Sequence, residues 1–218
     1  MGRHRRTGTV WATPEIIEDI LMSRRDIVVI ATSMGGVAAL CRVVGTLGAG
    51  FPGTLLAVQH TAPSSPACLD RILRRHTSIP VSYAVAGEVM KRGHFYLAPP
   101  KCHLVVSSRG TLALDDGPRV NFVRPAGDPL FASAASVFGP RVVGVVLTGC
   151  DGDGAEGLRA IKRAGGVSVV QHPGQAEAPD MPMHALNHDS PDYAVSITEL
   201  GPLLYALAQG RDPHTHNG

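Results

Sequence analysis

The chain has 218 residues, of which 44% are apolar and 17% are charged, and its formal net charge is +2. This composition suits one folded domain and argues against an intrinsically disordered chain. The mild charge, with no Lys/Arg run interleaved with aromatic residues, indicates no nucleic-acid partner. The four cysteines form no C-x-x-C pair, and no apolar run approaches the ~18 residues of a membrane helix. We therefore expect reduced thiols, no membrane insertion and a cytoplasmic location.

The first clear element is the apolar, β-branched run 27–31, which predicts a strand buried on both faces. A tight turn follows at 32–36, and helical spacing begins at Val37. Similar patterns predict the remaining elements: strands over 54–60, 80–86, 93–98, 141–147 and 167–171, and helices over 65–76, 129–138, 158–164, 183–187 and 197–209.

Segments 103–107 and 111–114 flank Ser108-Arg109-Gly110, which predicts a β-hairpin that lies as an antiparallel appendage on the main sheet. Strands that alternate with helices indicate right-handed βαβ crossovers. We expect an α/β fold in three layers: a mostly parallel, doubly wound sheet with helices on both faces and this small antiparallel hairpin. The expected organisation is one domain over 26–209, an N-terminal tail over 1–25 with a short helix at 14–22, and a C-terminal tail over 210–218.

Polar side chains follow three of the predicted core strands: Ser33, His60 and the pair Asp151 and Asp153. Because the carboxyl ends of parallel strands meet at one edge of the sheet, the three loops are expected to converge. A serine, a histidine and a carboxylate are the parts of a nucleophilic hydrolase. In such an enzyme the histidine takes the serine proton and the aspartate fixes the histidine tautomer.

Simpler interpretations stay open at this point. Ser33 alone suits a helix N-cap. The aspartate pair suits a metal-dependent phosphotransfer enzyme using Asp151 and Asp153, and loss of activity with a chelator would favour that alternative. A catalytically silent module that binds receptors or a regulatory partner is the third alternative. Failure of every serine reagent to label Ser33 would favour it.

Five motifs then occur in one order along residues 26–207: Ile-Ala-Thr-Ser-Met-Gly-Gly, Val-Gln-His, Gly-His-Phe-Tyr-Leu-Ala-Pro, Asp-Gly-Pro-Arg-Val-Asn and Leu-Thr-Gly-Cys-Asp-Gly-Asp-Gly-Ala-Glu-Gly. Together they resemble the catalytic domain of chemotaxis protein-glutamate methylesterases, the CheB family. Members of that family hydrolyse γ-glutamyl methyl esters on the cytoplasmic domains of chemoreceptors, and many also deamidate receptor glutamines. The resemblance implies methylated chemoreceptors as partners, and neither a metal nor an organic cofactor.

The resemblance also implies roles for individual residues. The nucleophile of the family falls on Ser33 and its histidine on His60. Its aspartate lies in Gly-Asn-Asp-Gly, which corresponds to 151–154 and places that role on Asp153. Cys150 stands where members usually carry Met, Gly152 where they carry Asn, and none of these departures removes the triad.

Fully regulated members carry an N-terminal phosphoryl-receiver domain, and the 25 residues before this domain are too few to form one. We therefore expect activity that does not depend on phosphorylation of this chain.

Two further expectations concern the geometry of the site. Two carboxylates two residues apart should not both point at His60, and Asp153 is the better partner because it lies nearer the N-terminus of the following helix. The dipole and the N–H groups of that helix would favour its charged form. The backbone N–H groups near Met34 and Cys150 are the expected oxyanion hole.

Overall fold

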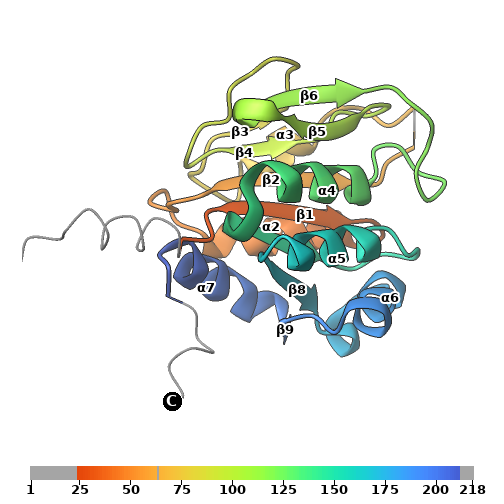
Figure 1. Cartoon of the computed structure of the whole chain (residues 1–218). Coiled ribbons are helices and arrows are strands. Elements are labelled where there is room, and N and C mark those ends of the chain that lie inside the picture. The colour runs from red at the N-terminus through yellow and green to blue at the C-terminus, as the bar shows by residue number, and fades with distance from the viewer. Residues whose placement is uncertain (1–23, 63, 212–218) are drawn as a thin grey trace, which may run out of the picture.

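The computed structural model describes residues 24–62 and 64–211, and a seven-stranded sheet forms its centre (Figure 1). The strands lie in the order β3-β4-β2-β1-β7-β8-β9, and every neighbouring pair is parallel. Their bounds are β1 Ile27–Thr32, β2 Thr54–Gln59, β3 Val81–Tyr83, β4 Phe95–Leu97, β7 Val142–Val146, β8 Val167–Gln171 and β9 Tyr193–Val195. The predicted α/β fold with a doubly wound sheet is confirmed.

Helices cover both faces of this sheet (Figure 1). One face carries α2 (Gly36–Thr46), α3 (Leu69–Leu73) and α7 (Ile197–Ala208), and the other carries α4 (Gly127–Phe138), α5 (Ala155–Arg163) and α6 (Asp180–Asp189). Val28 and Ile30 of β1 pack into the first core, and Val29 and Ala31 pack into the second. Because both sides of β1 are buried, its sequence is a continuous apolar run without polar alternation.

The hairpin consists of β5 (His103–Ser107) and β6 (Thr111–Asp115), joined by a 3₁₀ turn over Ser108–Gly110. It was expected as an appendage on the main sheet, but it forms a separate two-stranded sheet. Its apolar side chains Leu104 and Leu112 belong to the core beneath α4, and Ser133 of α4 accepts a hydrogen bond from the Val106 N–H at 3.0 Å. The hairpin therefore packs on a helix instead of extending the sheet (Figure 1).

Two other elements differ from expectation. The helix predicted over 65–76 is only α3, because Leu69 and Leu73 are its buried residues and provide a single turn of apolar face. Strand β9 was not predicted at all, since three residues at the edge of the sheet give too short a pattern to recognise. The remaining short helices are 3₁₀ turns over Gly139–Arg141 and Pro173–Gln175.

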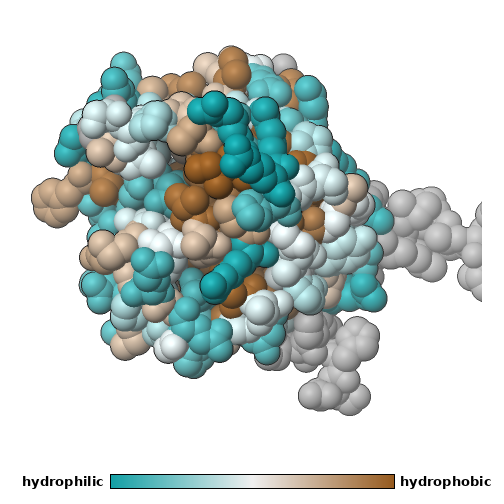
Figure 2. All heavy atoms as spheres, turned by 180° about the vertical axis from the view of Figure 1, so that it is seen from behind, coloured by the Kyte–Doolittle hydropathy of each residue, from teal (hydrophilic) through white to brown (hydrophobic). Residues whose placement is uncertain are grey.

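The predicted helix over 14–22 and most of both expected tails lie outside the described residues. All four cysteines are free thiols in the structure, in agreement with the expectation drawn from their spacing. Among the described helices, none combines the length and apolar character needed to cross a lipid bilayer. On the side opposite to that of Figure 1, apolar side chains gather near the centre of the surface and hydrophilic ones surround them (Figure 2).

Candidate active site

The loops after β1, β2 and β7 meet because these three strands are neighbours at the centre of the parallel sheet. Two backbone hydrogen bonds join the loops: the Ser33 N–H donates to the Thr148 carbonyl, and the His60 N–H donates to the Thr32 carbonyl, both at 2.9 Å. The sheet thus brings Ser33, His60 and the aspartate loop together, as the sequence predicts.

Ser33 occupies a turn between β1 and α2 whose shape depends on glycine. Gly35 has φ +74°, a left-handed conformation that side chains other than that of glycine rarely adopt. Across from Ser33, a Cβ added to Gly149 would lie 2.8 Å from the Cβ of Ser33 and 2.0 Å from the sulfur of Met181. The serine therefore sits in a space that one extra carbon on the neighbouring loop would fill.

Gln59 belongs to this cluster, although the sequence analysis did not single it out. Its Nε2 donates to the carbonyl oxygens of Ser33 at 2.8 Å and His60 at 2.9 Å, so one side chain fixes the backbone at both positions. Its sequence signals were its place in the Val-Gln-His motif and a polar residue at the end of a mostly apolar strand.

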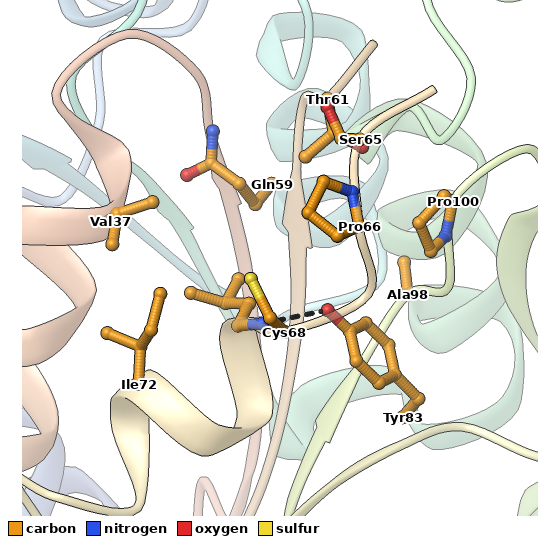
Figure 3. A pocket seen from close by; sticks show the side chains of 11 residues that line it. Val37, Gln59, Thr61, Ser65, Pro66, Cys68, Ile72, Tyr83, Ala98 and Pro100 are labelled. Atoms are coloured by element: carbon orange, nitrogen blue, oxygen red, sulfur yellow. Dashed lines mark hydrogen bonds between the residues drawn. The ribbon is translucent and has the colours of Figure 1, made fainter. Parts of the chain in front are cut away.

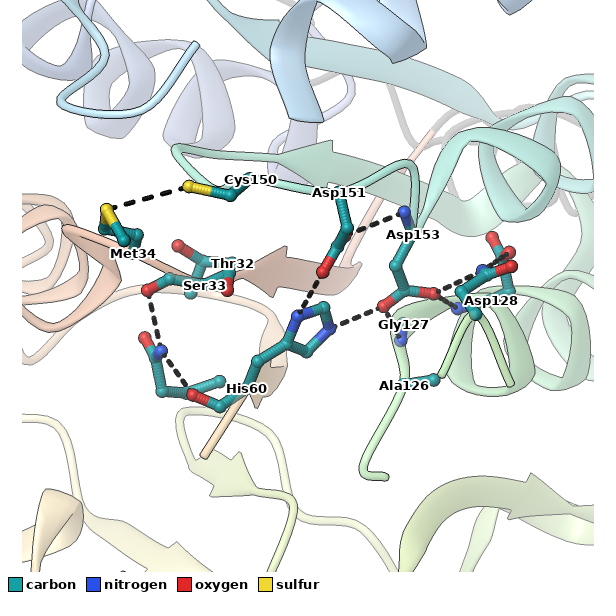
Figure 4. Close-up of polar contacts among 12 residues, drawn as sticks. Thr32, Ser33, Met34, His60, Ala126, Gly127, Asp128, Cys150, Asp151 and Asp153 are labelled. Atoms are coloured by element: carbon teal, nitrogen blue, oxygen red, sulfur yellow. Dashed lines mark hydrogen bonds and ion pairs between the residues drawn. The ribbon is translucent and has the colours of Figure 1, made fainter. Parts of the chain in front are cut away.

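His60 contacts two carboxylates, one on each ring nitrogen (Figure 4). Its Nε2 lies 2.8 Å from Oδ2 of Asp153, and its Nδ1 lies 3.0 Å from Oδ2 of Asp151. The side chain of Asp153 is fully buried, whereas that of Asp151 is 30% exposed. The expectation that only one of the two aspartates could point at His60 is therefore wrong. A turn in which the Asp153 N–H donates to Oδ1 of Asp151 at 3.0 Å brings both carboxylates to the ring.

Asp153 is held by several hydrogen-bond donors besides His60. Its carboxylate accepts from the backbone N–H groups of Gly127 at 2.5 Å and Asp128 at 3.1 Å, and from Nδ2 of Asn121 at 3.1 Å. Gly127 and Asp128 begin α4, so the supporting helix is not α5, which follows Asp153 in the chain. The expected stabilisation by a helix N-terminus is present, but the helix is α4, which ends fifteen residues before Asp153 in the chain.

Electrostatics in this cluster favour a protonated histidine. Burial alone would lower the pKa of His60, but the contacts with Asp151 and Asp153 outweigh it and raise that pKa to about 9. Burial likewise would raise the pKa of Asp153, but His60 and the α4 N–H groups outweigh it and lower that pKa. Burial and then the nearby Asp153 charge raise the pKa of Asp128.

The Ser33 hydroxyl forms no hydrogen bond within residues 24–62 and 64–211, so serine and histidine are not paired in this conformation. Since Asp153 engages Nε2, the nitrogen left for Ser33 is Nδ1, which lies on the Ser33 side of the ring in Figure 4. Proton transfer from Ser33 therefore requires the tautomer with its proton on Nε2.

The expected oxyanion donors lie on the two loops that flank Ser33. Neither the Met34 nor the Cys150 backbone N–H donates to an acceptor in the described part of the chain. Their side chains meet above the serine, with the Cys150 sulfur 3.6 Å from the Met34 sulfur (Figure 4). Free N–H groups beside a nucleophile are available to a substrate oxygen.

An apolar pocket of about 180 Å³ adjoins the site (Figure 3). Gln59 and Thr61, the neighbours of His60, form part of its wall, and Ile72 and Tyr83 line its floor. The Tyr83 hydroxyl oxygen accepts a hydrogen bond from the Leu69 N–H at 3.1 Å (Figure 3). Nothing in the sequence indicated this pocket, since its walls come from five separate segments.

The aspartate pair is poorly arranged for a metal ion. The Asp153 carboxylate faces N–H donors, whose positive ends would repel a cation. In residues 24–62 and 64–211, no group of three His, Cys, Asp or Glu side chains has the arrangement to hold one.

Comparison with known proteins identifies the family. The family model "CheB methylesterase" matches residues 28–204. A "putative protein-glutamate methylesterase/protein-glutamine glutaminase" of Leptospira interrogans is 38% identical over 182 residues, which cover 84% of this chain and 94% of that protein. A "protein-glutamate methylesterase/protein-glutamine glutaminase 2" of Caulobacter vibrioides is 34% identical over 186 residues, covering 84% of this chain and 54% of the relative.

A solved structure also resembles this chain. The CheB methylesterase catalytic domain of Thermotoga maritima superposes with a TM-score of 0.81 at 29% identity, covering 84% of this chain and 98% of that one. The resemblance inferred from the five motifs is confirmed by both comparisons. The catalytic roles of the individual residues stay predictions. The chain belongs to the CheB methylesterase family.

Proposed function

We propose that this protein is a serine hydrolase that removes methyl groups from γ-glutamyl methyl esters of chemoreceptors, with Ser33, His60 and Asp153 as its catalytic triad. The observation that carries the proposal is the contact of 2.8 Å between His60 and a fully buried carboxylate, at the edge of the sheet where Ser33 follows β1. That contact fixes the histidine tautomer and stabilises the imidazolium that forms during acyl transfer.

The first half-reaction forms an acyl-enzyme. His60 accepts the Ser33 proton at Nδ1 while the serine oxygen attacks the ester carbonyl carbon. The Met34 and Cys150 N–H groups donate to the oxyanion of the tetrahedral intermediate. The imidazolium then returns its proton to the departing methoxy oxygen, methanol leaves, and the glutamyl group remains esterified to Ser33.

The second half-reaction releases glutamate. His60 takes a proton from water, the resulting hydroxide attacks the acyl-enzyme, and the proton returns to the serine oxygen. The same steps with an amide in place of the ester release ammonia from glutamine. Relatives named both methylesterase and glutaminase support deamidation as a second activity of this site.

The proposed partners are the methylated cytoplasmic domains of chemoreceptors, and the proposed location is therefore the cytoplasm. A metal-dependent phosphotransfer enzyme is the weaker candidate, because Asp151 and Asp153 are both engaged by His60. Insensitivity of turnover to a chelator distinguishes the hydrolase from it. A silent binding module would retain receptor binding without any methanol release.

The decisive experiment follows methanol release from a methylated chemoreceptor fragment by mass spectrometry. Ser33→Ala should abolish release without changing the melting temperature appreciably, because the Ser33 side chain makes no hydrogen bond in the described structure. Ser136→Ala, at an exposed position on α4, is the matched control and should retain full turnover. Full activity of the Ser33 variant would end the triad proposal.

A further inference from the structure

Asp151 occupies an unusual place for a loop carboxylate, because it faces the same histidine nitrogen that the nucleophile needs. Its Oδ2 lies 3.0 Å from Nδ1 of His60, and its Oδ1 accepts the Asp153 N–H at 3.0 Å. The two contacts orient the carboxylate toward the ring although 30% of its side chain is exposed (Figure 4). The proposed reaction of Ser33, His60 and Asp153 gives Asp151 no role.

The chemistry of the ring decides what such a contact means. A neutral imidazole carries one N–H, and Asp153 requires it at Nε2. Nδ1 would then present a lone pair to a carboxylate oxygen 3.0 Å away, which is repulsive. A proton on Nδ1 converts the same contact into an ion pair. The observed distance therefore fits a doubly protonated His60.

The Nδ1 contact is also incomplete as a hydrogen bond. Nδ1 is buried and finds no well-directed acceptor among the described residues, although the charge of Asp151 is close. Asp153, in contrast, is fixed by His60 together with donors from α4 and Asn121. Of the two carboxylates, Asp151 is the one that can give way to another partner.

We propose that Asp151 is a positioning residue that pairs with protonated His60 at Nδ1 and competes with Ser33 for that nitrogen. The proposal rests on the proposed function, in which Nδ1 accepts the serine proton. In the resting form the imidazolium pairs with both aspartates, and the Ser33 hydroxyl is not hydrogen-bonded to His60. When the Nδ1 proton leaves, the attraction to Asp151 becomes repulsion, and Nδ1 turns to the serine hydroxyl.

Other charged groups surround the cluster but do not contact His60. Asp128, on α4, interacts with it only through Asp153. His184 of α6 lies against Gly152, and Glu177 lies against Gly35 at the start of α2. Asp151 and Asp153 are thus the charges that set the protonation of the ring, and they raise its pKa to about 9.

The test is the pH dependence of kcat/KM for Asp151→Asn between pH 5.5 and 10.5, with a methylated chemoreceptor fragment as substrate. Without the Asp151 charge, the imidazolium loses its proton at lower pH. An opposite charge in contact shifts a pKa by about 1–3 units, so the midpoint should fall by at least one unit. Below the midpoint, a shift of one unit increases the neutral fraction about tenfold, and kcat/KM at pH 7 should rise about tenfold. The plateau at high pH should stay unchanged.

Two matched variants and one inactive variant complete the experiment. Glu156→Gln removes one exposed negative charge from α5 nearby without touching His60 and should leave the midpoint unchanged. Asp151→Ser keeps a short oxygen acceptor near the Asp153 N–H and should behave as Asp151→Asn does, which guards against a misfolded variant. Ser33→Ala measures the non-enzymatic hydrolysis at each pH. Equal midpoints in wild type and Asp151→Asn, an equal shift in Glu156→Gln, or a loss of the high-pH plateau would each overturn the proposal.

A second measurement needs no substrate. Titration of ¹⁵N-labelled imidazole signals by NMR, with His60 assigned by the signal missing from His60→Gln, reports the protonation of both ring nitrogens. The Asp151→Asn signal should titrate at least one pH unit below that of wild type. An unchanged titration in an active esterase overturns this inference and leaves the proposed function intact. A shifted titration in a protein without esterase activity supports the pairing and overturns the proposed function.

Discussion

Replacing Asp153 by Asn tests the centre of the proposed mechanism with a change of only one atom per side chain. One carboxylate oxygen of Asp153 accepts from Gly127 and faces Nε2 of His60, and the other accepts from Asp128 and Asn121. An amide offers one acceptor and one donor group, so in either orientation its NH₂ meets N–H donors. The variant loses the charge that supports the imidazolium and also the partners of at least one oxygen.

The expected loss of activity is large. By analogy with the aspartate of triads in other serine hydrolases, turnover should fall by roughly 10⁴, which corresponds to about 5 kcal/mol of transition-state stabilisation. Asp151→Asn should change turnover far less. Stability should also fall, by about 1–3 kcal/mol for buried donors left without an acceptor. For a protein of this size, that lowers the melting temperature by a few degrees for each kcal/mol.

The assay compares kcat for methanol release in the Asp153→Asn and Asp151→Asn variants at a temperature well below either melting transition. Circular dichroism on the same samples separates loss of chemistry from loss of fold. If the Asp151 variant loses turnover by several orders of magnitude while the Asp153 variant keeps most of it, the assignment of the triad carboxylate is refuted.

Two further predictions follow from the packing and charge of the site. Gly149→Ala should destabilise the protein by about 1–3 kcal/mol and lower kcat, because the added Cβ would press on Ser33 and Met181. Gly48→Ala is the control, since its added Cβ meets nothing within 4 Å. If Gly48→Ala lowers the melting temperature as much as Gly149→Ala does, the packing argument is contradicted. The pKa of His60 is raised to about 9 from an ordinary value of 6.5. The protonated ring therefore stabilises the folded state fully below pH 6.5, and this stabilisation is lost as the pH rises toward 9. Urea unfolding at pH 6 and pH 9.5 should show a decline on the order of 1–3 kcal/mol that is absent from His60→Gln, and equal declines in both proteins would count against the charge pair.

Much of the fold could be predicted from sequence because the central strands are continuous apolar runs. Strands β1, β2 and β7 lie within a residue or two of the predicted ranges, and their adjacency follows from the rules of parallel sheets. The shorter elements were harder. Strand β9 and helix α3 depend on contacts with the edge of the sheet and with one turn of apolar residues, which a local pattern does not carry.

The site, like the fold, could be predicted only in part from the sequence. That Ser33 and His60 lie near the two aspartates follows from strand order alone, whereas the partners of Asp153 do not. Gly127 and Asp128 reach it from a helix on another segment, and no periodicity in the sequence links α4 to the loop after β7. The dual contact of His60 was missed for a geometric reason. Asp151 and Asp153 lie in a loop and not in a strand, and the turn in which the Asp153 N–H donates to Oδ1 of Asp151 aims both carboxylates at one ring.

The unequal support of the two aspartates explains how one site can be both rigid and responsive. Asp153 is buried, with donors from α4 and from Asn121 that a change of charge on His60 leaves in place. Asp151 is partly exposed, and among residues 24–62 and 64–211 it is held, besides by His60, by a single backbone N–H. When the histidine changes its protonation, we expect the loop around Asp151 to adjust while the Asp153 side of the ring stays fixed. A histidine anchored at one nitrogen and exchangeable at the other can turn from a resting ion pair to a base without any rearrangement of the sheet that carries it.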